Sequence, residues 1–353
     1  MAHEAIGTIR RQGLSGDRPQ GTLTGLAEHA QTGVNVAMDP RLRRICDTHG
    51  VFLRREAEDL GYSDQAIARL VKANAWHRVR GGAYTLGDVW ADLSENERYA
   101  LLCAAVYRQA KTDVVISHLS SANEWGAPLW DVDLSEVHLT RIDGKTGRRE
   151  AGVAQHRGQI LKGDLEVGRY GRNVMGPTRT CLELTTILDV EHAMVEIGDL
   201  FRRALTTVEA LQSRYALMER WPDTLRSDLI LRLVDGRPES VGEQRTLFLC
   251  WAQHLPAPIP QYPIRDRSGQ VIYRVDFAWP ELGLFLEFDG KVKYERYLRE
   301  GETPTDAVLR EKHREQLICE LTGWRCIRIV WADLYTPEMT AARIRAMFRS
   351  VAA

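Results

Sequence analysis

The chain has 353 residues, of which 44% are hydrophobic and 27% are charged, and its formal net charge at pH 7 is −1. This length and composition are typical of a globular protein with two or three domains. They exclude a chain that coats nucleic acid through its overall charge, so any DNA contact must come from a local patch. No apolar stretch approaches the roughly 18 residues of a membrane span, and the first residues lack the apolar core of a signal peptide. We therefore expect a cytoplasmic protein without a membrane partner.

The first part of the chain, residues 1–37, is rich in Gly, Gln, Thr, Ala and Arg and has no sustained apolar period. This composition predicts a disordered lead. Structured sequence begins abruptly at Met38 with the stretch MDPRLRRICDTHG. Met38 is also a candidate translation start, and the sequence leaves open whether the lead is always made.

Residues 38–90 predict three helices followed by a β-hairpin. The first helix carries apolar residues at helical spacing, and a second covers residues 54–60. Ser63 is a favourable N-cap for the third helix. Two short stretches, residues 76–79 and 83–86, then read as strands and are joined through a Gly-Gly turn. This order of elements is that of a winged helix-turn-helix.

A winged helix binds duplex DNA through its third helix, whose early residues face base edges in the major groove, while the wing lies near phosphates. The candidate DNA contacts lie on that helix, its cap and the wing: Ser63, Gln65, Arg69, Lys72, Arg78 and Arg80. Residues 39–90 hold nine Lys and Arg against seven acidic residues, so the local charge gives DNA binding modest support. A winged helix that binds protein instead remains open as an alternative.

The sequence of this region is similar to a known family. The stretch RREAEDLGYSDQAIARLVKANAWHRVRGGAYTL, which starts at Arg54, resembles the N-terminal domain of AbiEi-type antitoxins. The resemblance is carried by the order R-x-x-A-x-x-x-G-x-x-x-x-x-I-x-x-L-V, then an aromatic residue, then R-V-R-x-G-x-Y. These antitoxins are the repressor half of type IV toxin–antitoxin systems. The resemblance therefore implies a winged helix that binds promoter DNA, and a cognate toxin as a further partner.

Residues 91–235 predict an α/β middle domain. A helix over residues 93–110 precedes several short strands, and a later helix begins at Pro177. Strands are expected at residues 137–141, 152–156 and 173–175, and residues 114–117 form either a short strand or the end of a helix. This region resembles the middle of AbiEi-like proteins, which implies that it accompanies the DNA-binding domain, and we assign it no chemistry.

Three histidines of the middle domain invite a metal interpretation. His118, His138 and His156 are separated by 20 and 18 positions. These spacings match no local metal-binding signature, and nothing in the sequence forces the three side chains together, so we expect no metal site there. Arg179 and Glu183 stand four positions apart on a helix, which predicts a structural ion pair.

Residues 236–353 predict a third domain with a mixed sheet. Its first helix is followed by four prolines that we expect to interrupt regular structure: Pro256, Pro258, Pro260 and Pro263. Strands are then expected at residues 271–278, 282–289 and 324–331, and helices at 306–321 and 337–348.

Three acidic residues are expected to meet at one end of this sheet. Side chains alternate along a strand, so Glu287 and Asp289 share one face of the strand at 282–289. Asp276 lies on the neighbouring strand, near the turn. Like charges in one place repel unless a cation lies between them, and oxygen ligands suit Mg²⁺, with Mn²⁺ as an alternative. A solvated polar strand face remains the other interpretation.

The same region carries a second resemblance. The stretches GEQRTLFL, YRVDFAWPELGLFLEFDGKVKY and REKHREQLICELTGWRCIRIVWADL are similar to the small PD-(D/E)XK nuclease domains related to the very-short-patch-repair (Vsr) endonucleases. The resemblance implies that Glu243 is the helical acid ahead of the sheet. It also implies that Asp276, Glu287 and Asp289 hold the metal. Asp289 stands where this superfamily usually has its lysine, and Lys291 is the candidate substitute.

Together these patterns predict an α+β multidomain protein with a winged helix, an α/β middle domain and a Vsr-like α/β domain containing a mixed sheet. The leading interpretation is a DNA-binding protein with a Mg²⁺-dependent endonuclease domain, which hydrolyses phosphodiester bonds in double-stranded DNA. Its candidate catalytic residues are Glu243, Asp276, Glu287, Asp289 and Lys291. The alternative is a non-enzymatic AbiEi-like antitoxin and transcriptional repressor whose nuclease-like domain is inactive.

Overall fold

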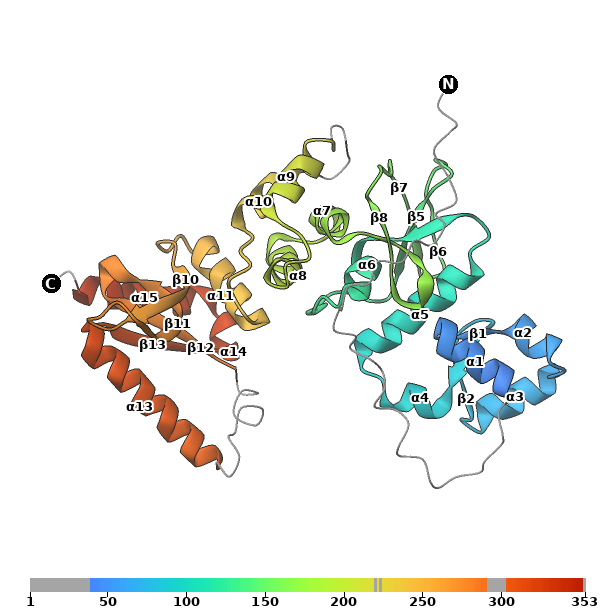
Figure 1. Cartoon of the computed structure of the whole chain (residues 1–353), viewed down its shortest axis with the longest axis horizontal. Coiled ribbons are helices and arrows are strands. Elements are labelled where there is room, and N and C mark those ends of the chain that lie inside the picture. The colour runs from blue at the N-terminus through green and yellow to red at the C-terminus, as the bar shows by residue number, and fades with distance from the viewer. Residues whose placement is uncertain (1–38, 219–220, 222–223, 291–302, 352–353) are drawn as a thin grey trace. The chain divides into compact units, whose positions relative to one another are not determined.

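A computed structural model describes residues 39–353 except 219–220, 222–223, 291–302 and 352–353. The predicted disordered lead at 1–37, the candidate start Met38 and the candidate catalytic Lys291 lie outside the described residues. Within them the chain folds into helices and three separate β-sheets, so the fold is mixed α/β (Figure 1). One sheet falls in each of the three predicted regions, and the boundaries between those regions remain predictions.

The first sheet belongs to a winged-helix arrangement. Its elements follow the predicted order: α1 (Pro40–His49), β1 (Phe52–Leu53), α2 (Arg54–Asp59), α3 (Asp64–Lys72), β2 (Trp76–Arg80) and β3 (Ala83–Leu86). β3 pairs antiparallel with both β1 and β2, so the order across the sheet is β1-β3-β2. The three helices and the hairpin predicted for this region are confirmed.

Aromatic rings pack the hairpin against β1 and against the turn between α2 and α3. The ring of Trp76 lies 4.7 Å from that of Phe52 and 5.0 Å from that of Tyr62, measured between centroids. Two helices follow the hairpin, α4 (Gly87–Asp92) and α5 (Glu95–Gln109). α5 packs against β1 and β3 through an apolar cluster, and Arg108 of α5 donates to the Val51 carbonyl (2.6 Å). The winged arrangement is therefore held to α5 by both apolar and polar contacts.

A six-stranded mixed sheet forms the middle region, in the order β6-β7-β5-β4-β9-β8. Its strands are β4 (Val114–Ile116), β5 (Val137–Arg141), β6 (Arg149–Glu150), β7 (Val153–Arg157), β8 (Leu165–Val167) and β9 (Asn173–Met175). The accompanying helices are α6 (His118–Glu124), α7 (Pro177–Ile187), α8 (Val190–Arg202), α9 (Val208–Tyr215) and α10 (Ser227–Leu233). One buried apolar core joins α5 to α10 with the central strands of this sheet. The sequence predicted β5, β7 and β9 as strands and gave a strand as one of two alternatives for β4, whereas the short β6 and β8 were not predicted.

The third sheet has four strands in the order β10-β11-β12-β13. They are β10 (Ile259–Arg265), β11 (Val271–Trp279), β12 (Leu284–Asp289) and β13 (Arg325–Val330). The first three pair antiparallel, and β12 pairs parallel with β13, so the predicted mixed sheet is confirmed. The accompanying helices are α11 (Val241–Ala252), α13 (Pro304–Thr322), α14 (Trp331–Leu334) and α15 (Pro337–Val351). No helix among the described residues is long and apolar enough to cross a membrane.

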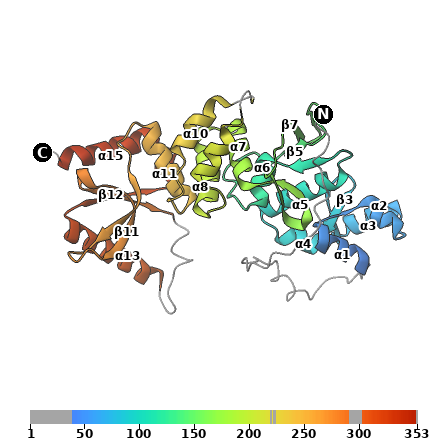
Figure 2. The same cartoon turned by 45° about the horizontal axis from the view of Figure 1, so that its top comes forward.

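The two faces of this sheet carry different helices, because side chains alternate along β12. Leu284, Leu286 and Phe288 pack in a cluster with residues of α11 and α15. Phe285 packs in a second cluster with Ile318 of α13. Figure 2 shows α13 and α15 on opposite sides of the sheet. The predicted alternation along β12 is confirmed.

The prediction that four prolines interrupt regular structure is wrong for two of them. Pro256 and Pro258 lie outside helix and strand, between α11 and β10, as predicted, whereas Pro260 and Pro263 lie within a strand. β10 includes Pro260 and Pro263, whose partners on β11 are Phe277 and Arg274. Proline cannot donate a hydrogen bond, but a strand at the edge of a sheet needs no donor on its outer side. β10 lies at an edge, so the prolines restrict its position in the sheet rather than ending the strand.

Candidate functional site

The predicted DNA contacts lie on the solvent side of α3 and on the wing. Gln65, Arg69 and Lys72 are exposed at helical spacing, whereas Ile67 on the opposite face of α3 is buried. Arg78 is exposed on β2. A polar helix face beside a basic hairpin is the arrangement with which a winged helix binds the major groove and the adjacent phosphates.

Two of the predicted DNA contacts, Ser63 and Arg80, are also engaged within the protein. The Ser63 hydroxyl accepts the Ala66 N–H (3.2 Å), so this side chain caps α3. Arg80 is partly buried at the end of β2, and burial lowers its pKa. We therefore expect the other four predicted residues to make the closest DNA contacts.

In the third sheet, Asp276 and Glu287 lie next to each other where β11 and β12 stop pairing. The pairing of these strands ends at Phe277 and Leu286, and the Asp276 carboxylate accepts the Phe288 N–H (2.8 Å). Glu287 is 7% exposed. Burial, together with the negative charge of Asp276, raises the pKa of Glu287 to about 8. The predicted meeting of these two carboxylates is confirmed, and their repulsion is visible in that pKa.

Glu243 lies in the first turn of α11, where its carboxylate accepts hydrogen bonds from neighbouring groups. The donors include the Glu239 N–H (2.8 Å), the Ser240 hydroxyl (2.8 Å) and the Gln261 side-chain amide (2.7 Å). Gln261 stands opposite Asp276, because the residues on either side of it on β10 pair with those on either side of Asp276 on β11. Gln261 therefore links Glu243 to the region of the other two acids.

The approach of α11 to β12 depends on a glycine. A Cβ atom at Gly242 would lie 2.0 Å from the Phe288 ring, a distance that real Cβ contacts do not reach. Glycine lets the helix come close enough for the adjacent Glu243 to reach this end of the sheet.

Arg314 is a member of the carboxylate cluster that the sequence pattern did not reveal. It lies on α13 and donates to Glu287 (3.1 Å) while pairing with Glu311 (2.6 Å). Arg328 of β13 pairs with the same Glu311 (3.2 Å) and with Glu315 (2.6 Å). The only indication of Arg314 in the sequence was the high density of charged residues in the stretch REKHREQ, but any solvated helix can show that pattern. Arg314 thus supplies positive charge beside Glu287, a role for which the sequence suggested only a metal ion.

Asp289 is the last residue of β12 and is partly buried. A different group of side chains, among the residues that the structure describes, comes together closely enough to hold a metal ion. It consists of His118, His138 and His156. Metal binding by Asp276, Glu287 and Asp289 remains a prediction.

The expectation that nothing brings these three histidines together is wrong. His118 is the first residue of α6, His138 lies on β5 and His156 lies on β7. His138 Nδ1 lies 2.9 Å from His156 Nε2. Their spacing in the sequence held no signature because the pairing of β5 with β7 and the packing of α6, rather than a local loop, bring them together.

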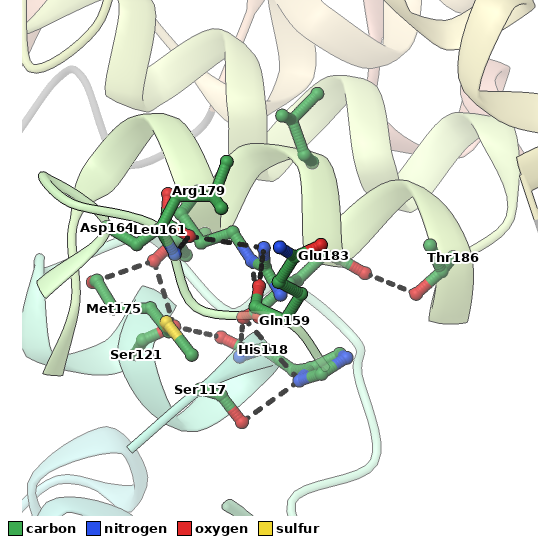
Figure 3. Close-up of polar contacts among 12 residues, drawn as sticks. Ser117, His118, Ser121, Gln159, Leu161, Asp164, Met175, Arg179, Glu183 and Thr186 are labelled. Carbon is green, nitrogen blue, oxygen red and sulfur yellow. Dashed lines mark hydrogen bonds and ion pairs between the residues drawn. The ribbon is translucent and has the colours of Figure 1, made fainter. Parts of the chain in front are cut away.

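A buried ion-pair network lies beside His118 (Figure 3). Arg179 and Glu183 form the predicted ion pair on α7, with Nε 2.9 Å from Oε1 and both side chains at most 2% exposed. Asp164 contacts Arg179 (3.4 Å) and Arg214 (2.7 Å). Glu183 also accepts the His118 backbone N–H (2.9 Å), so the network joins α7 to the start of α6.

Comparison with known proteins supports the interpretation of the winged region. Residues 41–87 match the family described as "Transcriptional regulator, AbiEi antitoxin". Two relatives from Mycobacterium tuberculosis, the uncharacterized proteins MT2308 (strain CDC 1551 / Oshkosh) and Rv2248 (strain ATCC 25618 / H37Rv), are each 29% identical to this chain over 175 residues. That match spans 49% of this chain and 61% of either relative. The AbiEi resemblance is confirmed for residues 41–87, whereas the Vsr-like resemblance gains no support and remains a prediction.

Proposed function

We propose that this chain is a DNA-binding transcriptional regulator of the AbiEi antitoxin type. The observation that carries the proposal is the coincidence of the family match at residues 41–87 with the winged arrangement, whose third helix exposes a polar face. A repressor of this type binds promoter DNA, and a cognate toxin is the proposed protein partner.

In this proposal α3 enters the major groove and the hairpin lies along the backbone. Gln65, near the start of α3, would contact a base edge, because an amide pairs well with adenine. Arg69, Lys72 and Arg78 would contact phosphates. Asp64 is an acidic residue next to Gln65 at the start of α3. Its ion pair with Arg54 offsets the repulsion between its carboxylate and DNA.

Replacing Arg69 and Arg78 together with Ala is expected to weaken binding to all duplex sequences alike. Removing one charge that neutralises a phosphate should reduce the slope of log affinity against log salt by about 1, so the slope of the double variant should fall by about 2. Gel-shift or anisotropy titrations over a salt series measure that slope. Lys162→Ala, which removes an exposed charge from the middle region, should leave it unchanged. A double variant with the parent affinity and slope would show that this face does not contact DNA.

DNA cleavage by the C-terminal region is a second candidate function. It is favoured by the adjacency of Asp276 and Glu287 on β11 and β12, with Glu243 held nearby by Gln261. We propose that these acids and Asp289 hold Mg²⁺, which would activate a water and stabilise charge on a scissile phosphate. Arg314 already donates a hydrogen bond to Glu287, so Mg²⁺ would have to displace that contact.

Under this second proposal the full chain should nick supercoiled plasmid with Mg²⁺ or Mn²⁺ but not with EDTA. Asp276→Asn should abolish nicking, because it removes a metal ligand at unchanged size. Glu281→Gln, which removes an exposed acid from the turn before β12, serves as the matched control and should nick normally. Equal nicking by Asp276→Asn would indicate a contaminating nuclease, and folded protein without nicking in either metal would leave the regulator as the function.

A further inference from the structure

We propose that His118, His138 and His156 form a binding site for a divalent transition-metal ion that favours imidazole ligands, with Zn²⁺ as the best match. The three side chains offer one ring nitrogen each, and these nitrogens all lie within 4.8 Å of one another. Three imidazoles with one remaining position are a ligand set known for zinc. Imidazole nitrogen suits Zn²⁺, Cu²⁺ and Ni²⁺, whereas Mg²⁺ and Ca²⁺ prefer oxygen.

The fold itself directs the three rings to one point. β5 and β7 are parallel neighbours in a register that pairs His138 with Ala154 and Thr140 with His156. Residues two apart on a strand share a face, so His138 and His156 lie on the same face of the sheet. The first residue of α6, His118, stacks on His156 with a centroid separation of 3.7 Å.

The distances require little movement for metal binding. With Zn–N bonds of about 2.0–2.1 Å in tetrahedral geometry, ligand nitrogens lie about 3.3 Å apart. His138 Nδ1 and His156 Nε2 are 2.9 Å apart, so this pair would separate by a few tenths of an ångström. The widest pair, at up to 4.8 Å, would close by rotation of a ring.

His118 is also oriented by atoms around it. Its Nδ1 lies 3.0 Å from the Ser117 hydroxyl and 3.6 Å from a Glu183 carboxylate oxygen, which leaves Nε2 for the ion. An oxygen partner on the second ring nitrogen is the usual outer arrangement of a metal-bound histidine. His118 has a φ of 52°, in the left-handed region, and the hydrogen bond from its N–H to Glu183 holds this strained backbone in place.

Charge and space beside the rings are compatible with a cation. The positive charge of Arg149 acts on His138 more strongly than the negative charge of Asp133 does, and Arg149 is itself paired with Glu136 (2.9 Å), so the charges beside the rings are mixed. His138 also lines a cavity of about 310 Å³, which borders the same acidic residues.

The test uses the full chain without a histidine tag, stripped of metal with a chelator and dialysed. Zn²⁺ is titrated in competition with a chromogenic chelator, and Co²⁺ is titrated while its visible absorption is recorded. We expect one ion per chain and a tetrahedral Co²⁺ spectrum without a sulfur charge-transfer band. His138→Gln and His156→Gln should each lower the affinity by more than the 10- to 100-fold that loss of an outer partner costs.

Two controls separate this site from other ligands. His192→Gln changes a histidine that lines the same cavity but lies outside the group, and it should bind Zn²⁺ like the parent. Cys319→Ser tests the partly exposed thiols. The proposal is overturned if the stripped chain binds no ion, if His138→Gln binds with the parent affinity, or if Cys319→Ser loses the ion. Thermal unfolding without metal shows whether each variant is folded, and Zn²⁺ should raise the midpoint of the parent, of His192→Gln and of Cys319→Ser but not that of His138→Gln or His156→Gln.

Discussion

Replacing Arg179 with Met is expected to lower the free energy of unfolding by about 3–5 kcal/mol, the cost of breaking a buried ion pair from one side. The Arg179 side chain is 2% exposed, donates to Glu183 (2.9 Å) and lies 3.9 Å above the centre of the Trp221 ring. Met fills much of the volume but leaves the Glu183 carboxylate buried without its main counter-charge. Urea unfolding of the full chain, followed by fluorescence and circular dichroism, measures the effect.

Two further variants isolate the cause of that destabilisation. Adding Glu183→Gln to Arg179→Met removes the uncompensated charge, so the double variant should recover part of the stability. Arg148→Ala breaks an ion pair with Glu150 whose side chains are 69% and 67% exposed, and it should cost at most about 1 kcal/mol. An Arg179→Met protein within about 1 kcal/mol of the parent would contradict a structural role for this network.

Glu287→Gln is expected to stabilise the protein at pH 8, by on the order of a few kcal/mol. The pKa of Glu287 is about 8 in the folded protein because of burial and the charge of Asp276, against 4.5 for an ordinary glutamate. Between these two values the unfolded chain releases a proton that the folded chain keeps. The stability of the parent therefore falls as pH rises from about 4.5 to 8, and glutamine, which cannot ionise, removes that pH-dependent decrease.

A neighbouring glutamate gives a control of opposite sign. Burial opposes ionisation of Glu311, but its contacts with Arg314 and Arg328 outweigh burial and lower its pKa. Ionised Glu311 thus contributes stability above its unfolded pKa that disappears as pH falls, and Glu311→Gln should destabilise the protein at pH 8. Unfolding midpoints measured from about pH 3 to pH 8 check both signs. A Glu287→Gln variant no more stable than the parent at pH 8 would show that Arg314 keeps Glu287 ionised.

The parts of the fold that the sequence predicted are those set by local pattern. The helix capped by Ser63, the hairpin after it and the alternation of Leu284, Phe285 and Leu286 depend on residues a few positions apart. The same alternation placed Glu287 correctly beside Asp276 once the two strands were assumed to be neighbours.

The parts that the sequence could not predict depend on contacts through space. His118, His138 and His156 meet because β5 pairs in parallel with β7 and α6 packs beside them, and neither contact leaves a signature in local spacing. Arg314 reaches Glu287 from a helix whose charged residues look like an ordinary solvated face. Both are cases in which the tertiary fold, rather than the pattern of residues, decides which side chains meet.

The prolines of β10 affect how readily a strand of another chain could pair with this edge of the sheet. An edge strand with unpaired N–H groups can accept a strand from another chain, which is a common route to aggregation. Pro260 and Pro263 carry no N–H, so β10 offers fewer backbone donors than a strand of ordinary residues would. Such an edge disfavours the addition of a strand from another copy of this chain, although both prolines remain part of β10.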